Sequence, residues 1–379
     1  MNSRRSHSLT LDRISHRFGE FQAVRDITLE IAAGELVALL GPSGCGKSTL
    51  LRIISGFIAQ TSGTVLFDGS PVDHLTPRRR GVGIVFQNYA LFPHMTVRQN
   101  IAYGLEAQNW PKAEITPRVN EMLALVQMSE MADRKPSQLS GGQQQRIALA
   151  RCLAVDPKIL LLDEPFGALD KNLRLDMQIE VKRLQREYGI TTVLVTHDQE
   201  EALSMADRVA VMNRGVIEQI ASPTDIYDKP ATLFVNEFVG TTNILRGEIV
   251  HTDGTSADVR VDDEVVLRCR VGIPVSDGQP VSVSVRPESL RFAREAGPGR
   301  IRGIIKAVMP LGPNVLYEIE TARQATMKIS LSRVAGNAPD VRLGTAVFAE
   351  AVTPESCLVF SPARQGQGHL PSNSIGENP

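Results

Sequence analysis

The chain has 379 residues, enough for two or three compact units with sizeable cores. Hydrophobic residues make up 42%, charged residues 22%, and the formal net charge is −1, so composition gives no electrostatic reason to expect nucleic acid or anionic lipid as a general partner. The four cysteines lie far apart, which excludes a disulfide framework, and no stretch approaches the roughly 18 apolar residues of a membrane-spanning helix.

The first part of the chain alternates short apolar runs with polar or glycine turns. The runs lie at residues 36–40 (LVALL), 159–163 (ILLLD) and 191–196 (TTVLVT). Runs of this length and composition predict strands of a mainly parallel sheet that is covered on both faces. Between them, residues 88–156 follow a helical pattern, which we interpret as a helical insertion in an α/β core.

A glycine-rich stretch, GPSGCGKST at residues 41–49, directly follows the first of these runs. It matches the pattern G-x-x-x-x-G-K-[ST] between a predicted strand and a predicted helix. Backbone N–H groups in such a turn bind phosphate, the lysine reaches the β- and γ-phosphates, and the hydroxyl after it is placed to ligate Mg²⁺. The sequence therefore predicts a nucleoside triphosphate site made by Gly41, Pro42, Ser43, Gly44, Cys45, Gly46, Lys47, Ser48 and Thr49.

Cys45 contributes its backbone to this predicted loop. Because the residue lies next to a helix N-terminus, we expect a lowered pKa for its thiol, and we expect alkylation of the thiol to block ATP binding. The other cysteines, Cys152, Cys269 and Cys357, receive no role beyond packing.

Two carboxylates follow the apolar run at residues 159–163. Asp163, at the end of the predicted strand, is suited to hold the Mg²⁺ shell, and Glu164 points to the other side of the strand. A carboxylate in that place can orient and deprotonate an attacking water. Beside the phosphate loop, this pair predicts that the bound triphosphate is hydrolysed, with Glu164 as a catalytic residue.

The segment LSGGQ, residues 139–143, opens a predicted helix. Ser140 is a good N-cap, and Gly141 and Gly142 expose backbone N–H groups at the helix start. One nucleotide has no use for two phosphate-binding ends on one subunit. Here the sequence resembles the ATP-binding cassette (ABC) ATPases, in which this segment, Ser140 to Gln143 in our numbering, closes over ATP held by a partner subunit.

Other residues match the ABC pattern one by one. The resemblance implies that Gln87 is a Mg²⁺ ligand and a link to the membrane partner, and that Asp170, in the ALD of residues 168–170, communicates between the two sites. His197 matches the histidine that contacts the γ-phosphate and is the second expected catalytic residue. Phe18 stands where the family stacks an aromatic ring on adenine; the alternatives are Phe21, or a place in the core for either ring.

From about residue 241, short alternating segments separated by Gly, Pro and Asp predict a small all-β barrel or sandwich. The segment VSVSVRPESLRF resembles the OB-type (TOBE) regulatory domain of importer ATPases. The expected fold is therefore an α/β P-loop NTPase (RecA-like) core with a helical insertion, plus a C-terminal all-β domain. We assign residues 1–240 to the nucleotide-binding domain, 241–362 to the TOBE domain and 363–379 to a disordered tail.

The closest resemblance is to the spermidine/putrescine import ATPases, which implies an ATP-hydrolysing subunit of a binding-protein-dependent importer of polyamines. The implied partners are a second copy of the chain, transmembrane permease subunits that dock on residues 88–108, and indirectly a periplasmic solute-binding protein, with no nucleic acid. The implied place is peripheral, on the cytoplasmic face of the inner membrane.

The imported solute stays open, since ferric-iron, sulfate and 2-aminoethylphosphonate importers have closely similar cassettes. Two other classes of protein compete with an importer ATPase. One is an exporter or lipid-flipping cassette, and the other is a soluble ABC ATPase that acts on nucleic acid or ribosomes.

Overall fold

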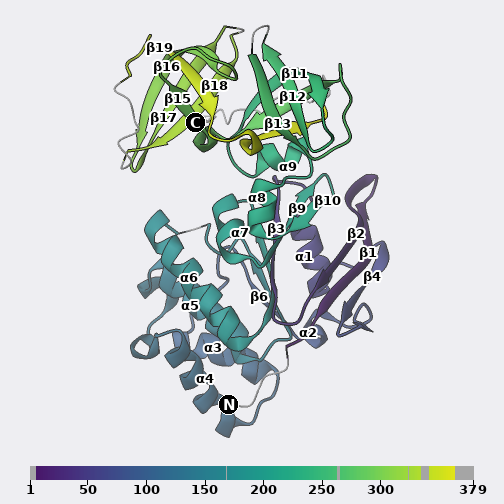
Figure 1. Cartoon of the computed structure of the whole chain (residues 1–379). Helices are drawn as coiled ribbons and strands as arrows, with labels where there is room; N and C mark the ends of the chain where they lie inside the picture. Colours follow the sequence, from purple (N-terminus) through teal and green to yellow (C-terminus); the bar gives the residue numbers. More distant parts are fainter. Residues whose placement is uncertain (1–5, 168, 263–264, 323, 334–340, 363–379) are drawn as a thin grey trace, which may run out of the picture. The chain divides into compact units, whose positions relative to one another are not determined.

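The computed structural model describes residues 6–167, 169–262, 265–322, 324–333 and 341–362 (Figure 1). The chain divides into two compact units, with the boundary between Pro230 and Ala231. Each unit has its own hydrophobic core. Among the described residues, no helix combines the length and the apolar character that crossing a membrane requires.

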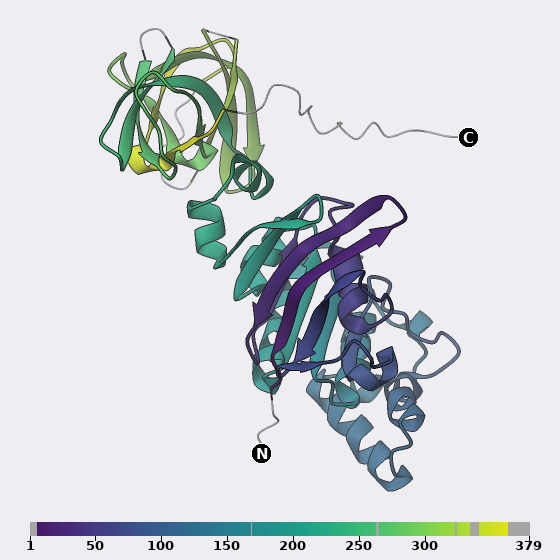
Figure 2. The ribbon, with the colours of Figure 1, turned by 90° about the vertical axis from the view of Figure 1, so that its right-hand side faces the viewer.

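A six-stranded sheet with the order β10-β9-β3-β8-β7-β6 runs through the first unit (Figure 2). The predicted runs are its strands β3 (Leu36–Leu40), β7 (Ile159–Asp163) and β8 (Thr191–Thr196), with the expected bounds. These strands run parallel to one another and to β6 (Val82–Val85) and β9 (Arg208–Asn213), whereas β10 (Val216–Ala221) is antiparallel. Burial on both faces explains why the runs do not alternate with polar residues.

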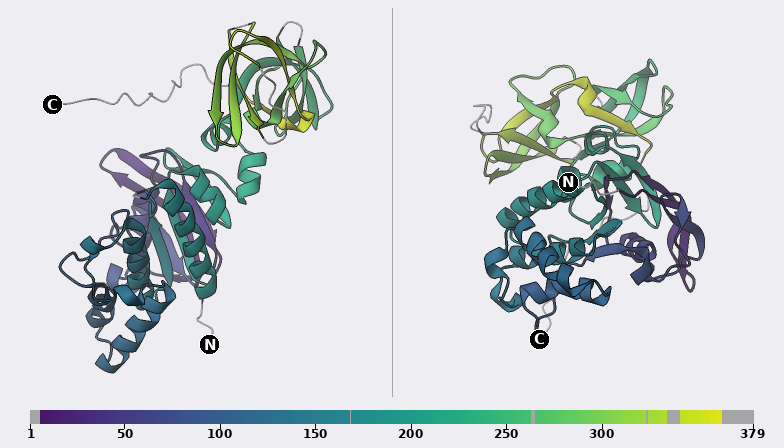
Figure 3. Two further views of the ribbon diagram at one scale, coloured as in Figure 1. Left: turned by 90° about the vertical axis from the view of Figure 1, so that its left-hand side faces the viewer. Right: turned by 90° about the horizontal axis from the view of Figure 1, so that it is seen from below.

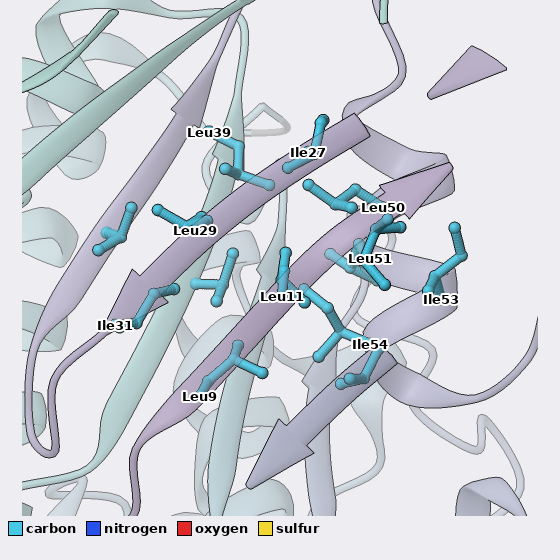
Figure 4. Close-up of a cluster of buried hydrophobic side chains, with 14 of the residues drawn as sticks. Leu9, Leu11, Ile27, Leu29, Ile31, Leu39, Leu50, Leu51, Ile53 and Ile54 are labelled. Atoms are coloured by element: carbon cyan, nitrogen blue, oxygen red, sulfur yellow. The ribbon is translucent and has the colours of Figure 1, made fainter. Parts of the chain in front are cut away.

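A second, antiparallel sheet in this unit was not distinguished in the sequence. It contains β1 (Leu9–Phe18), β2 (Phe21–Ile31), β4 (Ser62–Phe67) and β5 (Ser70–Pro71). Helix α1 (Lys47–Ser55) follows β3, and Figure 4 shows its side chains among those of β1 and β2. Together they form one core with residues of the six-stranded sheet. This packing holds the start of α1 in place.

The predicted helical insertion consists mainly of α3 (Val97–Ala107), α4 (Lys112–Leu125) and α5 (Gly141–Ala154), which pack on one another. These helices lie on the opposite side of the unit from the antiparallel sheet (Figure 3). The remaining helices of the unit are α2 (Pro77–Arg80), α6 (Lys171–Tyr188), α7 (Gln199–Met205) and α8 (Pro223–Asp228).

In its described residues, the second unit is all-β apart from one short α-helix and 3-10 turns. Its first part is a closed barrel of β11 (Asn243–Thr252), β12 (Ser256–Asp262), β13 (Val265–Val271), β20 (Cys357–Phe360) and β14 (Pro280–Val285). Its second part is a five-stranded sheet of β15 (Leu290–Ala293), β19 (Ala346–Ala351), β16 (Ile301–Leu311), β17 (Asn314–Thr321) and β18 (Thr326–Ser332). The unit therefore combines a barrel with a separate sheet.

Helix α9 (Leu233–Phe238) packs with the second unit, so the contact boundary lies at residue 230, before the expected domain limit at 240. Asn236 Nδ2 donates a hydrogen bond of 2.6 Å to Ser284 Oγ, and Arg286 Nη1 donates one of 3.0 Å to the Asn236 carbonyl. The tail predicted to be disordered, residues 363–379, lies outside the described residues.

Candidate functional site

The phosphate loop joins β3 to α1, as predicted. Lys47, the first residue of α1, is buried, and its Nζ donates to the carbonyls of Gly41 at 2.7 Å and Pro42 at 3.1 Å. Gly46 has a φ of 107°, and a Cβ added there would lie 2.5 Å from the Ala23 carbonyl oxygen. The loop is therefore pressed against β2 at Gly46, while Ser43, Gly44 and Ser48 are exposed.

The expectation of a lowered pKa at Cys45 is wrong. The side chain is only 3% exposed, and this burial raises the pKa of the thiol although the nearby Lys47 ammonium acts in the opposite direction. The helix N-terminus is close in sequence, but the loss of solvent around the sulfur has the larger effect. Burial and protonation both slow alkylation, and the block of ATP binding by a modified Cys45 stays a prediction.

Three neighbouring parallel strands bring side chains together at their carboxyl ends. Gln87 lies just after β6, Glu164 directly follows β7, and His197 directly follows β8. The Glu164 carboxylate accepts a hydrogen bond of 3.3 Å from Gln87 Nε2 and lies 3.1 Å from His197 Nδ1. Because β3 is the next strand beyond β8, the phosphate loop leaves the sheet at this same edge.

The two carboxylates have different environments. Burial raises the pKa of Asp163, the neighbouring Glu164 charge raises it further, and the positive charges of Arg52 and Lys47 counteract both. Glu164 itself has a φ of 46°, in the left-handed region, and its N–H donates to the Val195 carbonyl at 2.9 Å. The backbone thus turns sharply at the end of β7, and the Glu164 side chain points towards Gln87 and His197.

A group of residues after β8, which sequence reasoning missed, holds the segment of His197. Thr196 Oγ1 donates to the buried Glu201 carboxylate at 2.7 Å and accepts from the Asp198 N–H at 2.9 Å. Asp198 caps α7, and its carboxylate also pairs with Arg174 at 3.0 Å. No sequence signal distinguishes this network from an ordinary helix start.

The segment Ser140–Gln143 begins α5, as predicted. Ser140 is the N-cap, its N–H donates to Gln143 Oε1 at 2.9 Å, and its Oγ accepts from the Gln143 N–H at 3.4 Å. A Cβ on Gly142 would lie 3.0 Å from the Leu173 side chain, so this glycine permits α6 to approach. The capping box leaves the exposed helix start rigid and available to an anion.

The remaining predicted residues that the structure describes lie in two separate places. Asp170 is the N-cap of α6 and accepts from the Leu173 N–H at 3.0 Å, whereas residue 168 of the ALD segment lies outside the described residues. Phe18 and Phe21 face each other across β1 and β2 and are 49% and 63% exposed, so a core role is wrong for both rings. The ring of His16 meets Phe18 edge-on, with centroids 4.5 Å apart.

The residues at this edge fit a triphosphate with Mg²⁺. The loop provides exposed backbone N–H groups and an ammonium for phosphate, and Ser48, Gln87 and Asp163 carry the hard oxygen ligands that Mg²⁺ takes. In the described parts of the chain, no three His, Cys, Asp or Glu residues form a metal cage of their own. That agrees with Mg²⁺ sites in which the protein provides one or two carboxylates beside phosphate oxygens.

Comparison with known proteins identifies the family. The family model for the ABC transporter matches residues 24–167, and the model for the TOBE domain matches residues 283–360. The spermidine/putrescine import ATP-binding protein PotA of Rubrobacter xylanophilus is 49% identical over 312 residues, which cover 82% of both chains. The chain belongs to the ABC transporter family.

Two further similarities of this ABC protein extend the comparison. The sulfate/thiosulfate import ATP-binding protein CysA of Nocardia farcinica is 45% identical over 347 residues, covering 90% of this chain and 97% of the relative. A solved dimeric ATP-binding cassette, in a post-hydrolysis state bound to ADP and Pi, is 34% identical, with a TM-score of 0.51 over 57% of this chain and 98% of the other. The predicted P-loop core, TOBE domain and ABC-type ATPase activity are thereby confirmed.

Proposed function

We propose that this ABC ATPase energises a binding-protein-dependent importer of polyamines such as spermidine and putrescine. The similarity to a spermidine/putrescine import ATP-binding protein over 82% of the chain and the matched TOBE domain support an importer. Sulfate is the second candidate solute, because the sulfate/thiosulfate relative aligns over 90% of the chain. In either case the chain would work beneath transmembrane permease subunits, at the cytoplasmic face of the inner membrane, with solute delivered by a periplasmic binding protein.

The contact of Glu164 with both Gln87 and His197, beside the phosphate loop, is the observation that carries the hydrolytic role. Glu164 would orient the attacking water and take its proton at the carboxylate, which is general base catalysis. His197 would hold this carboxylate through Nδ1 and present Nε2 to the γ-phosphate. The loop packs around Lys47 and bonds its ammonium. The positive charge would therefore already lie where the phosphates bind, before the substrate arrives.

The other expected residues receive binding roles. Backbone N–H groups of residues 43–49 and Lys47 would bind the phosphates, and Ser48, Gln87 and Asp163 would hold Mg²⁺. When bound, Mg²⁺ neutralises charge on the β- and γ-phosphate oxygens. Phe18, whose ring is exposed at the end of β1, would stack on the adenine.

A second copy of the chain would complete each nucleotide site. The capped start of α5 would offer the backbone N–H groups of Gly141 and Gly142 to an anion, while the Gln143 N–H already donates to Ser140 Oγ within the capping box. We infer that Ser140 to Gln143 of one copy bind the phosphates held by the other copy's loop. Asp170 caps α6 by accepting from the Leu173 N–H, and the Leu173 side chain packs against Gly142. Asp170 would therefore communicate structural changes between the two nucleotide sites.

The variant Glu164→Gln tests the proposed chemistry. The amide cannot take a proton, so we expect the turnover number for ATP to fall at least about 100-fold, while ATP binding is retained and a closed dimer accumulates. Turnover is measured by phosphate release, and dimerisation by size-exclusion chromatography with ATP. Glu187→Gln is the control, since Glu187 is exposed and pairs with Arg183 on α6. Wild-type turnover in Glu164→Gln would refute the catalytic assignment.

Uptake by a strain lacking this chain separates the solutes. Wild-type protein should restore uptake of labelled spermidine and putrescine, and Glu164→Gln should not. Restoration of sulfate uptake alone would replace polyamines by the second candidate. Restoration of none of the three would contradict the importer proposed for these solutes.

A further inference from the structure

Two consecutive residues just after Gln87 have a strained backbone. Tyr89 and Ala90 have φ values of 60° and 47°, in the left-handed region that non-glycine residues rarely adopt. This conformation is sterically strained for a residue that has a Cβ, and it persists where surrounding contacts impose it. The strain lies two residues from a side chain that touches Glu164, so whatever holds this backbone also acts on the hydrolytic centre.

Arg151, on α5, holds both strained residues. Its Nη2 donates to the Tyr89 carbonyl at 2.9 Å and its Nη1 donates to the Ala90 carbonyl at 2.7 Å. The guanidinium carbon also lies 5.7 Å from the centroid of the Phe92 ring, which packs on Tyr103 of α3 at 4.5 Å. A planar guanidinium can serve two adjacent carbonyls and an aromatic face at once, which an ammonium cannot.

Arg151 lies between the Ser140 start of α5 and the residues that lead to Glu164. Helix α5 begins at the Ser140 cap, and Arg151 lies in its last turn, so a continuous helix joins the two. At the other end, the backbone of residues 89–90 leads back to Gln87 and from there to the Glu164 carboxylate. Burial lowers the pKa of the Arg151 guanidinium, so the two carbonyls also compensate for the desolvation of its charge.

We propose that Arg151 is a positioning residue that keeps Gln87 on Glu164 and transmits movement of the Ser140 end of α5 to the hydrolytic centre. The inference rests on the proposed function, in which Ser140 binds nucleotide held by the second copy. It predicts that Arg151 controls the turnover number for ATP and leaves the affinity for Mg²⁺-free nucleotide unchanged, because that affinity depends on the phosphate loop and not on Gln87.

Arg151→Lys and Arg151→Met in the full chain test the proposal. We expect the turnover number for ATP to fall about 10-fold or more in both, with the dissociation constant for ATP, measured without Mg²⁺, within about 2-fold of wild type. Lysine should not rescue, since one ammonium cannot reproduce the two-pronged donation to Tyr89 and Ala90. Turnover is measured by phosphate release, and affinity by equilibrium binding of a fluorescent ATP analogue.

Arg118→Lys is the matched control. Arg118, on α4, is also buried against α5, but it donates to the carbonyls of Leu153 and Ala154 at the helix end, at 2.8 and 2.9 Å. We expect this variant to lower the unfolding temperature and to leave turnover unchanged. If loss of helix stability alone lowered turnover, Arg118→Lys would lower it too, and the proposal would fail.

A rescue variant keeps the test decisive if loss of Arg151 weakens folding. Glycine adopts a positive φ without steric cost, so Ala90→Gly should restore part of the turnover lost in Arg151→Lys. Absence of any rescue, or unchanged turnover in both Arg151 variants, would overturn the proposal. If Glu164→Gln also turned over ATP normally, the proposed function itself would fail; an inactive Glu164→Gln beside an active Arg151→Lys would reject the Arg151 role alone.

Discussion

At this site, burial shifts the pKa values of single residues as much as neighbouring charges do. Cys45 illustrates the point, because its burial outweighs the lysine beside it. Glu201 is a second case, since it is only 3% exposed and bonds to Thr196, the residue before His197. Burial raises the pKa of Glu201, and the bond from Thr196 partly counteracts the shift. The stability of the segment that carries His197 should therefore depend on pH.

Glu201→Gln tests this dependence. A carboxyl with a raised pKa binds its proton more tightly in the folded state, so its stabilising effect is complete below the ordinary pKa of about 4.3 and is lost as pH rises through the raised value. Glutamine stays neutral, so the variant should gain unfolding temperature relative to wild type between pH 4.5 and pH 7.5. A gain of a few degrees corresponds to about 1 kcal/mol in a domain of this size.

The control for this measurement is Glu200→Gln, one position earlier on α7 and exposed. It removes a carboxylate from the same helix turn without changing a buried group. A difference between Glu201→Gln and wild type that does not change with pH would contradict the role of the buried carboxyl.

At the scale of elements, two glycines of the phosphate loop distinguish the cost of an unfavourable backbone conformation from the cost of close packing. Gly44 and Gly46 both have a positive φ, of 79° and 107°, but only at Gly46 would a Cβ collide, 2.5 Å from the Ala23 carbonyl oxygen. We expect Gly44→Ala to lower the free energy of unfolding by about 1 kcal/mol through strain alone. Gly46→Ala adds overpacking and should cost more than about 2 kcal/mol in total.

Denaturant unfolding of the full chain without nucleotide measures both losses. Equal losses would show that the contact between the loop and β2 contributes nothing to stability. The contact matters because β2 belongs to the antiparallel sheet, which the alternating sequence pattern did not separate from the parallel one. The two sheets share a core with α1, and only their packing brings Ala23 to Gly46.

At the scale of the whole molecule, the proposed site is shared between two copies. A dimer with Lys47→Ala in one copy and Ser140→Ala in the other has both lesions in the same shared site and keeps one site intact. A dimer with both substitutions in one copy has one lesion in each site. We therefore expect more ATP retained per dimer in the first arrangement than in the second, by about one molecule where each lesion abolishes retention.

Differently tagged copies, purified together and loaded with radiolabelled ATP, provide the measurement. The two arrangements contain the same substitutions, so a general loss of stability affects them equally. Equal retention in both would contradict a site formed between copies and would favour a site completed within one chain.

Much of the site could be predicted from the sequence because its residues follow strands and begin helices. The runs at β3, β7 and β8, the cap at Ser140 and the place of Glu164 after its strand depend on local patterns that a linear chain displays, whereas Gln87 and His197 were assigned by the resemblance to ABC ATPases. The contacts of Glu164 with Gln87 at 3.3 Å and with His197 at 3.1 Å agree with the strand pattern, since parallel strands end at one edge.

By itself the sequence determined the strands of the parallel sheet, the phosphate loop, the capped start of α5 and the all-β second part, since each depends on neighbours along the chain. Tertiary structure alone decided the pKa of Cys45, the exposure of Phe18, the strain at Tyr89 and Ala90, and the hold that Arg151 has on them. The physical reason is that desolvation and long-range hydrogen bonds arise between residues far apart in sequence, and no local pattern records which of them meet.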